Sequence, residues 1–191
     1  LSRNDGPNCL HGGAQGFGHR LWQAEAAEPR DGEAEALVFS TTSPHGDQGF
    51  PGELQVRVRY ALSATENAWR IDYEATTDRA TVVNLTHHDY FNLAGHGSAL
   101  RHRLTIPASR YSEVDEHLIP LRHASVEGTP FDFRQACPIV ARIRDAHPQL
   151  LRDKGYAHNI LHDDTPDAQG LRLAAVPEEP QPASAAIAPT S

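Results

Sequence analysis

The sequence predicts an all-β fold, most simply a large antiparallel β-sandwich, on two observations. Apolar and polar residues alternate strictly over Leu54 to Leu62 and again over Trp69 to Thr77. A period of two residues over such lengths is typical of half-buried antiparallel strands. The sequence also contains no internal repeat and no long segment with helical periodicity. Its 191 residues suit one large domain.

The part before these strands is expected to be mostly irregular. Residues 1–23 are rich in glycine and turn-forming residues, with Phe17, Leu21 and Trp22 as the expected buried anchors. A polar connection is predicted over residues 24–36, and a strand over residues 34–42. The next segment, SPHGDQGFPG, is predicted to be an irregular loop because of its glycines and prolines.

Further short strands are predicted after the alternating pair, over residues 81–88, 101–107, 111–120 (a strand and a turn) and 155–162. A short helix is expected within residues 138–151. From residue 176 the composition changes to proline and alanine, which predicts a disordered tail over 176–191 after a domain over 1–175. The chain has no methionine and opens like the middle of a domain, so we expect a fragment.

Composition argues against several classes of partner. The net charge is −8, from 17 basic and 25 acidic residues, and no run of like charges offers a basic stripe for nucleic acid. No apolar stretch reaches the ~20 residues of a membrane helix. Cys9 and Cys137 form neither a disulfide framework nor a zinc pattern. We therefore expect a cytoplasmic protein that binds neither nucleic acid nor membrane.

The densest group of polar residues is NLTHHDYFNLAG, from Asn84 to Gly95. Strand periodicity would place His88 on the face shared with Asn84, opposite Leu85 and His87. An imidazole titrates near neutral pH, so His88 is a candidate general acid or base. A structural histidine bonded to a neighbouring hydroxyl or carbonyl explains the pattern equally well.

His11, in LHGG, is the second candidate, because the adjacent glycines would let a small polar ligand approach the backbone. A loop histidine without a role is the alternative. Twelve histidines also raise the question of a metal. His87 and His88 would point to opposite strand faces, and no HExxH spacing occurs, so no metal is expected. The sequence contains no G-x-S-x-G for a serine nucleophile.

Taken together, these motifs resemble the aldose 1-epimerases, the galactose mutarotase family. LHGGAQGFGHRLW is similar to the family's LHGG-x-x-GFD-x-x-x-W loop, and VVNLTHHDYFNLAG to its NLTNHxYFNLAG signature. SPHGDQGFPG, VDEHLIP, VEGTPFDFR and GYAHNILH match further family segments in the family's order. The resemblance extends from about residue 3 to residue 175.

The resemblance implies a β-supersandwich that binds a free hexose and interconverts its α and β anomers without a metal or organic cofactor. A general acid protonates the ring oxygen while a base takes the proton of the anomeric hydroxyl, and the ring opens and closes again. By motif position His88 would be the acid, and His11 would hydrogen-bond the sugar near the same atom. Asn84, Tyr90 and Asn92 would bind or brace the substrate, and Phe17 or Phe91 would either line the cleft or pack in the core.

The chain differs from the family pattern at several points. Ala157 stands where the family has a sugar-binding Asp, and Gly18 where it has the Asp after GF. The glutamate that acts as the family's catalytic base has no match, and neither does a sugar-binding arginine of the family. Low activity of the chain alone is therefore expected, with exposed strand edges that favour self-association. Two alternatives stay open: a non-catalytic carbohydrate-binding or regulatory module, and a hexose 6-phosphate epimerase, which the acidic balance does not favour.

Overall fold

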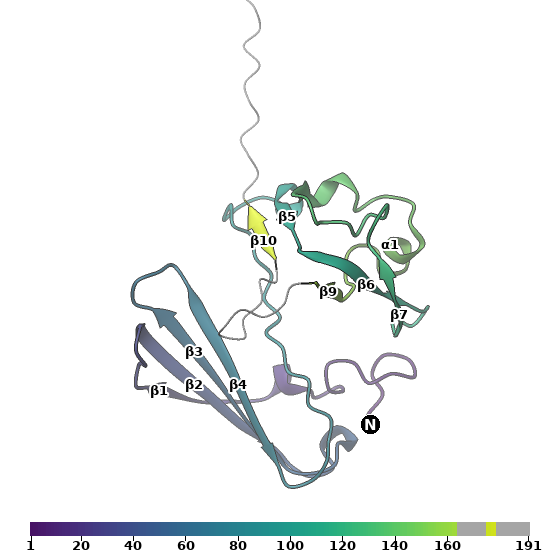
Figure 1. Ribbon diagram of the computed structural model, residues 1–191. Coiled ribbons are helices and arrows are strands. Elements are labelled where there is room, and N and C mark those ends of the chain that lie inside the picture. Colours follow the sequence, from purple (N-terminus) through teal and green to yellow (C-terminus); the bar gives the residue numbers. More distant parts are fainter. Residues whose placement is uncertain (164–174, 179–191) are drawn as a thin grey trace, which may run out of the picture. The chain divides into compact units, whose positions relative to one another are not determined.

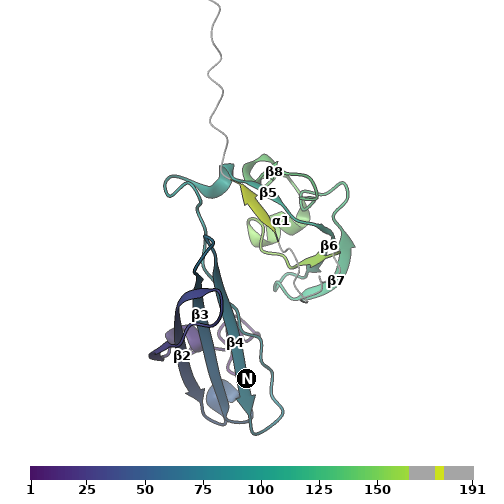
Figure 2. The same ribbon diagram turned by 60° about the vertical axis from the view of Figure 1, so that its left-hand side comes forward.

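The computed structural model describes residues 1–163 and 175–178 (Figures 1 and 2). Two compact units divide the chain, Leu1–His88 and Asp89–Ser191, and each is considered by itself. All the strand pairings in the described part are antiparallel, which confirms the predicted all-β class. None of the described helices is long and apolar enough to cross a membrane.

The first unit is built on one four-stranded sheet in the order β1-β2-β3-β4 (Figure 1). The strands are β1 (Gln23–Ala27), β2 (Glu33–Ser43), β3 (Leu54–Ser63) and β4 (Trp69–Thr77). The predicted bounds of the last three agree within one residue. The strand β1 falls in the predicted polar connection, and that prediction is wrong. Its sequence, QAEAA, lacks the β-branched and aromatic residues that signal a strand.

The core of the first unit lies against the alternating residues of β3. Leu54, Val56 and Val58 are buried, as the periodicity predicts. Phe17 and Trp22 pack against them from the glycine-rich segment, so this part of the prediction is confirmed. Leu21, the third expected anchor, is 97% exposed, because the chain enters β1 immediately after Trp22 and only alternate side chains can face the sheet.

The predicted strand over residues 81–88 does not form: this segment pairs with no other strand. It still alternates in burial, with Leu85 and His87 half-buried and Asn84, Thr86 and His88 exposed. Leu85 packs on the core cluster, and His87 contacts Tyr60 and Trp69. The periodicity therefore reflects burial against the face of the sheet rather than pairing at its edge.

The second unit contains two three-stranded sheets, in the orders β10-β5-β8 and β7-β6-β9 (Figures 1 and 2). The first consists of β5 (Arg103–Thr105), β8 (Cys137–Pro138) and β10 (Val176–Glu178), and the second of β6 (Ala108–Val114), β7 (Pro120–Ser125) and β9 (Ile160–His162). Disorder was expected from residue 176, but Val176–Glu178 pair with β5. The rest of the expected tail, residues 179–191, lies outside the described residues.

The predicted helix is reduced to α1 (Pro148–Asp153). It begins at a proline, which fits the first turn of a helix, and His147 caps it by accepting a hydrogen bond from the Gln149 amide. Residues 139–141 form only a 3-10 turn. The core of this unit consists of Tyr111, Val126, Phe131 and Leu150, in which the Tyr111 and Phe131 rings stack with centroids 4.3 Å apart.

Candidate functional site

The two histidines predicted from separate motifs lie together in the first unit. The ring centroids of His11 and His88 are 5.8 Å apart, and the rings meet edge to face at 73°. Both side chains are exposed, so a ligand in solvent can reach them. The structure therefore places two imidazoles, each able to donate or accept a proton, within reach of one small molecule.

A compact glycine-rich turn holds His11. The His11 backbone has a φ of 52°, a left-handed conformation that costs free energy for a residue other than glycine. A Cβ atom at Gly16 would lie 2.0 Å from the His11 carbonyl oxygen, so this close approach requires glycine. Nearby, the Asn4 side-chain amide brackets Leu10: it donates to the Leu10 carbonyl at 3.0 Å and accepts from the Leu10 amide at 2.8 Å.

The segment that carries His88 is fixed by its neighbours rather than by strand pairing. The His87 ring lies 5.6 Å from the Tyr60 ring and 5.2 Å from the Trp69 ring, meeting both edge to face. Leu85 packs on the buried cluster of β3. In an extended chain successive side chains point to opposite sides, so inward-facing Leu85 and His87 leave His88 directed away from the sheet.

The three predicted substrate-binding side chains are placed differently. Asn84 is exposed on the same segment as His88. Tyr90 is 89% exposed and belongs with Asn92 to the second unit. The Asn92 amide donates to the carbonyls of His96 and Gly97, each at 3.2 Å, and accepts from the Ala94 amide. Its observed contacts brace the turn that closes the motif.

A second loop, residues 43–52, contacts the His11 loop, which our sequence reasoning missed. Arg20 pairs with Asp47, and the Gln15 amide donates to the Gln48 side chain at 3.4 Å. The only sequence signal was the group of glycines at 12, 13 and 16, which indicates close packing of some kind without naming the partner. Phe17, which could have lined a cleft, packs in the core instead, and Phe91 is 63% exposed.

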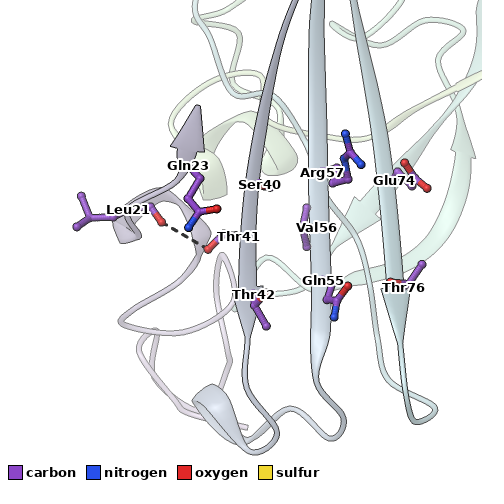
Figure 3. Close-up of a pocket in the computed structure, with 10 residues that line it drawn as sticks. All are labelled: Leu21, Gln23, Ser40, Thr41, Thr42, Gln55, Val56, Arg57, Glu74 and Thr76. Carbon is purple, nitrogen blue, oxygen red and sulfur yellow. Dashed lines mark hydrogen bonds between the residues drawn. The ribbon is translucent and has the colours of Figure 1, made fainter. Parts of the chain in front are cut away.

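A polar hollow of about 650 Å³ lies on the sheet of the first unit (Figure 3). In-register residues from all four strands contribute to it: Gln23, Ser40, Arg57 and Glu74. None of the five predicted site residues lines it. Most of the lining is hydrophilic because Gln55 and Arg57 alternate with the apolar residues of β3. The hollow is therefore a solvated sheet face rather than a continuation of the histidine site.

Ala157 and its neighbour His158 lie in the second unit. Ala157 is exposed, whereas His158 contacts the rings of Tyr111 and Phe131, and burial lowers its pKa. Among the described residues, no three His, Cys, Asp or Glu side chains are close enough to hold a metal ion.

Comparison with known proteins gives one consistent result. Residues 1–185 match the family model described as aldose 1-epimerase. A galactose mutarotase of Bos taurus is 41% identical over 84% of this chain, and an aldose 1-epimerase of Escherichia coli is 44% identical over the same share. The crystal structure of a galactose 1-epimerase from Lactobacillus acidophilus superposes with a TM-score of 0.81 at 31% identity, covering 92% of this chain.

These matches span only part of the relatives. The aligned region is 44% of the bovine protein, 45% of the E. coli protein and 50% of the Lactobacillus chain. The family match also runs ten residues past residue 175, where the change in composition predicts the end of the domain.

Proposed function

Because the chain belongs to the aldose 1-epimerase family, we propose that it acts in the interconversion of the α and β anomers of a free hexose such as galactose or glucose. The observation that supports this most strongly is the pairing of His11 with His88. The two residues come from motifs far apart in the sequence, and the fold of a single unit brings them together at an exposed position.

In the proposed reaction His88 donates a proton to the ring oxygen as the C1–O5 bond breaks. A base removes the proton of the anomeric hydroxyl, so that C1 becomes the carbonyl carbon of the open-chain aldehyde. Rotation about C1–C2 and the reverse proton transfers then close the ring as the other anomer. An imidazole suits the first step because it can donate a proton near neutral pH. His11 hydrogen-bonds the sugar beside the ring oxygen, and no residue of this chain is assigned as the base.

Asn84 and Tyr90 are proposed to contact sugar hydroxyls, and Asn92 to brace the turn that follows them. The chain is proposed to act in the cytoplasm, without a metal or organic cofactor. The acidic net charge supports a neutral sugar over a sugar phosphate, because a phosphate is normally held by converging cationic groups.

The test is to follow the optical rotation of freshly dissolved α-D-galactose with the wild-type chain, His88→Asn and His11→Asn. His117→Asn, an exposed histidine in the second unit, is the matched control. Catalysis by the wild-type chain should fall by ~10²–10⁴-fold in His88→Asn, the usual contribution of a general acid, and be unchanged in His117→Asn. A wild-type rate equal to that of buffer would sink the catalytic proposal for this chain.

Calorimetry with galactose separates the remaining alternative. Saturable binding without mutarotation would favour a non-catalytic carbohydrate-binding module, for which Ala157 is the supporting observation. Absence of both binding and mutarotation would contradict both functions.

A further inference from the structure

We propose that Arg20 and Asp47 are positioning residues for His11. Their ion pair joins the glycine-rich loop of residues 10–20 to the loop of residues 43–52, and it thereby keeps the His11 ring beside His88. The expected effect on catalysis rests on the proposed function. The contacts that position His11 do not, because they all lie within the first unit. Four observations support it.

The first observation is that the ion pair is shielded and has additional partners. Arg20 Nη2 pairs with Asp47 Oδ2, and the two side chains are only 20% and 17% exposed. The Ser43 hydroxyl donates to the same carboxylate oxygen at 2.5 Å, and Arg20 Nη1 donates to the Thr42 carbonyl at 3.3 Å. Exposed ion pairs contribute little to stability, but a shielded pair with further hydrogen bonds holds its geometry more firmly.

The second observation is that Arg20 is anchored at its other side. Its guanidinium lies 5.6 Å from the centre of the Phe17 ring, and Phe17 packs on the buried residues of β3. The Trp22 indole N–H donates to the Phe17 carbonyl at 3.1 Å. Through Arg20, Asp47 is therefore linked to the hydrophobic core rather than to a mobile side chain.

The third observation concerns Gln48, the neighbour of Asp47. Its backbone is left-handed, with a φ of 47°, and its side chain accepts a hydrogen bond from the Gln15 amide at 3.4 Å. A Cβ atom at Gly13 would lie 2.5 Å from Gln48 Oε1, so the Gln48 side chain fills the space left by this glycine. The Ser2 amide also donates to the Gln48 carbonyl at 2.7 Å. Asp47 and Gln48 thus hold the glycine-rich loop at two points.

The fourth observation is the left-handed backbone of His11. Such a conformation persists only where the surroundings impose it. Residues 11–16 form a tight turn, in which the Gly13 amide donates to the Leu10 carbonyl and the Gly16 amide to the Gly13 carbonyl. If the contacts at Gly13 and Arg20 were lost, His11 could relax towards an ordinary φ, and its ring would move away from His88.

The experiment uses the full chain labelled with ¹⁵N and ¹³C in histidine, and it compares wild type, Asp47→Asn and Asp47→Glu. In the wild type we expect a nuclear Overhauser effect between the ring protons of His11 and His88. Asp47→Asn should lose this effect and shift the His11 ring resonances, whereas Asp47→Glu, which keeps the carboxylate, should restore both at least in part. Mutarotation by Asp47→Asn should fall by about 10–100-fold, the typical result of a displaced catalytic group.

Asp72→Asn is the matched control, because Asp72 on β4 pairs in the same unit with Arg30 and Arg70, whose side chains are 62% and 70% exposed. It should leave the ring contact and the resonances unchanged. A purely structural role for Asp47 would lower the midpoint of unfolding while preserving the ring contact in the folded protein. A folded Asp47→Asn protein with the wild-type effect between His11 and His88 would overturn the proposal.

If Asp47→Asn does not fold, Gln48→Gly provides the second variant, since it keeps the ion pair and removes only the side chain that packs on Gly13. It should weaken the same ring contact, and an unchanged contact would count against the proposal. Failure of the proposed function can be distinguished from failure of the positioning role, because the ring contact is measured without sugar. A wild-type chain that shows the contact and its dependence on Asp47, but no mutarotation, would retain the positioning role and lose the catalytic one.

Discussion

Two histidines of the first unit and two of the second lie in contrasting surroundings. The first unit presents His11 and His88 at its surface, where their rings meet. The second unit buries His102, which is 3% exposed, and packs His158 against the rings of Tyr111 and Phe131. Imidazoles at a surface are available to a ligand, whereas those enclosed by aromatic rings and backbone groups serve as structural hydrogen-bonding groups.

The contacts of His158 show how burial determines its role. Its Nε2 atom lies 3.0 Å from Gln149 Oε1, and because this oxygen can only accept, Nε2 carries the proton. Within the described part of the chain, the buried Nδ1 atom has no hydrogen-bond partner. Burial lowers the pKa of His158, so the neutral ring is the form that the folded second unit favours.

The first unit instead contains an ion pair that is largely shielded from solvent. Arg59 and Glu33 form two parallel hydrogen bonds of 2.7 Å between β3 and β2, and Arg59 also donates to the Glu28 carbonyl. The hydrogen bond from Arg59 is the largest cause that lowers the pKa of Glu33 to about 2. The two units should therefore differ in their sensitivity to single substitutions and to acid.

The largest effect is expected from Phe131→Ala in the second unit. Phe131 is 2% exposed and stacks on Tyr111, so its truncation removes the centre of the aromatic core. We expect the free energy of unfolding to fall by about 3–5 kcal/mol, measured by urea denaturation with tyrosine fluorescence. Leu121→Ala, at a 64% exposed position of the same unit, should change it by less than about 0.5 kcal/mol. Similar losses in both variants would contradict the assigned core.

Gln149→Met should have the next largest effect. Gln149 accepts from the Val114 amide at 2.9 Å and donates to the Val114 carbonyl at 3.1 Å, at a register shift of β6. Methionine is similar in size but leaves the buried Val114 amide unpaired, which costs about 1–3 kcal/mol, whereas the Val114 carbonyl keeps its hydrogen bond from Arg152. Hydrogen exchange at the Val114 amide should accelerate accordingly. Gln55→Met on the exposed sheet face is the control, and equal stability of both variants would argue against this bridge.

A smaller effect is expected in the first unit from His87→Ala. The substitution removes two edge-to-face contacts, each worth about 0.5–1.5 kcal/mol, while Leu85 continues to hold the segment. Both tryptophans of the chain, Trp22 and Trp69, belong to this unit, so tryptophan fluorescence reports its unfolding directly. His117→Ala should be neutral. If His87→Ala were also neutral, the ring contacts would not be what holds His88 in place.

The smallest effect is expected on mild acidification. Because the pKa of His158 is lowered on folding, its neutral ring contributes fully to the stability of the second unit above the unfolded-state pKa of about 6.5. This contribution is lost as the pH falls below that value. Glu33 has a folded pKa of about 2, so it contributes fully to the stability of the first unit above its unfolded pKa of about 4.3. This contribution is lost only as the pH falls from about 4.3 towards 2.

Between pH 6.5 and 5, the stability of the second unit, followed through its resolved amide signals, should thus fall before the stability of the first unit does. His158→Gln should remove this step, since glutamine does not titrate. An equal loss of stability in both units over that range would contradict the expected difference in their sensitivity to acid.

Sequence patterns were reliable where burial follows a regular period. The alternation in residues 54–62 predicted β3 because the core on one face of a sheet selects every second residue. Residues 69–77 form β4 as predicted, although its residues are exposed or half-buried. The same rule failed at residues 81–88, since a segment lying across a sheet face shows the same alternation without pairing. The strand β1 had no such signal, because alanine and glutamate carry little preference for strands.

By itself, the sequence determined the antiparallel β class and the family, and it predicted His11 and His88 as site residues, since all of these follow from local periodicity and short motifs. Only the tertiary structure decided that His11 meets His88, that His87 is held between Tyr60 and Trp69, and that Arg20 and Asp47 join two loops. These contacts link residues far apart in the chain. No local pattern encodes such distances, because they arise only when the core and the glycine-rich turns bring separate segments into van der Waals contact.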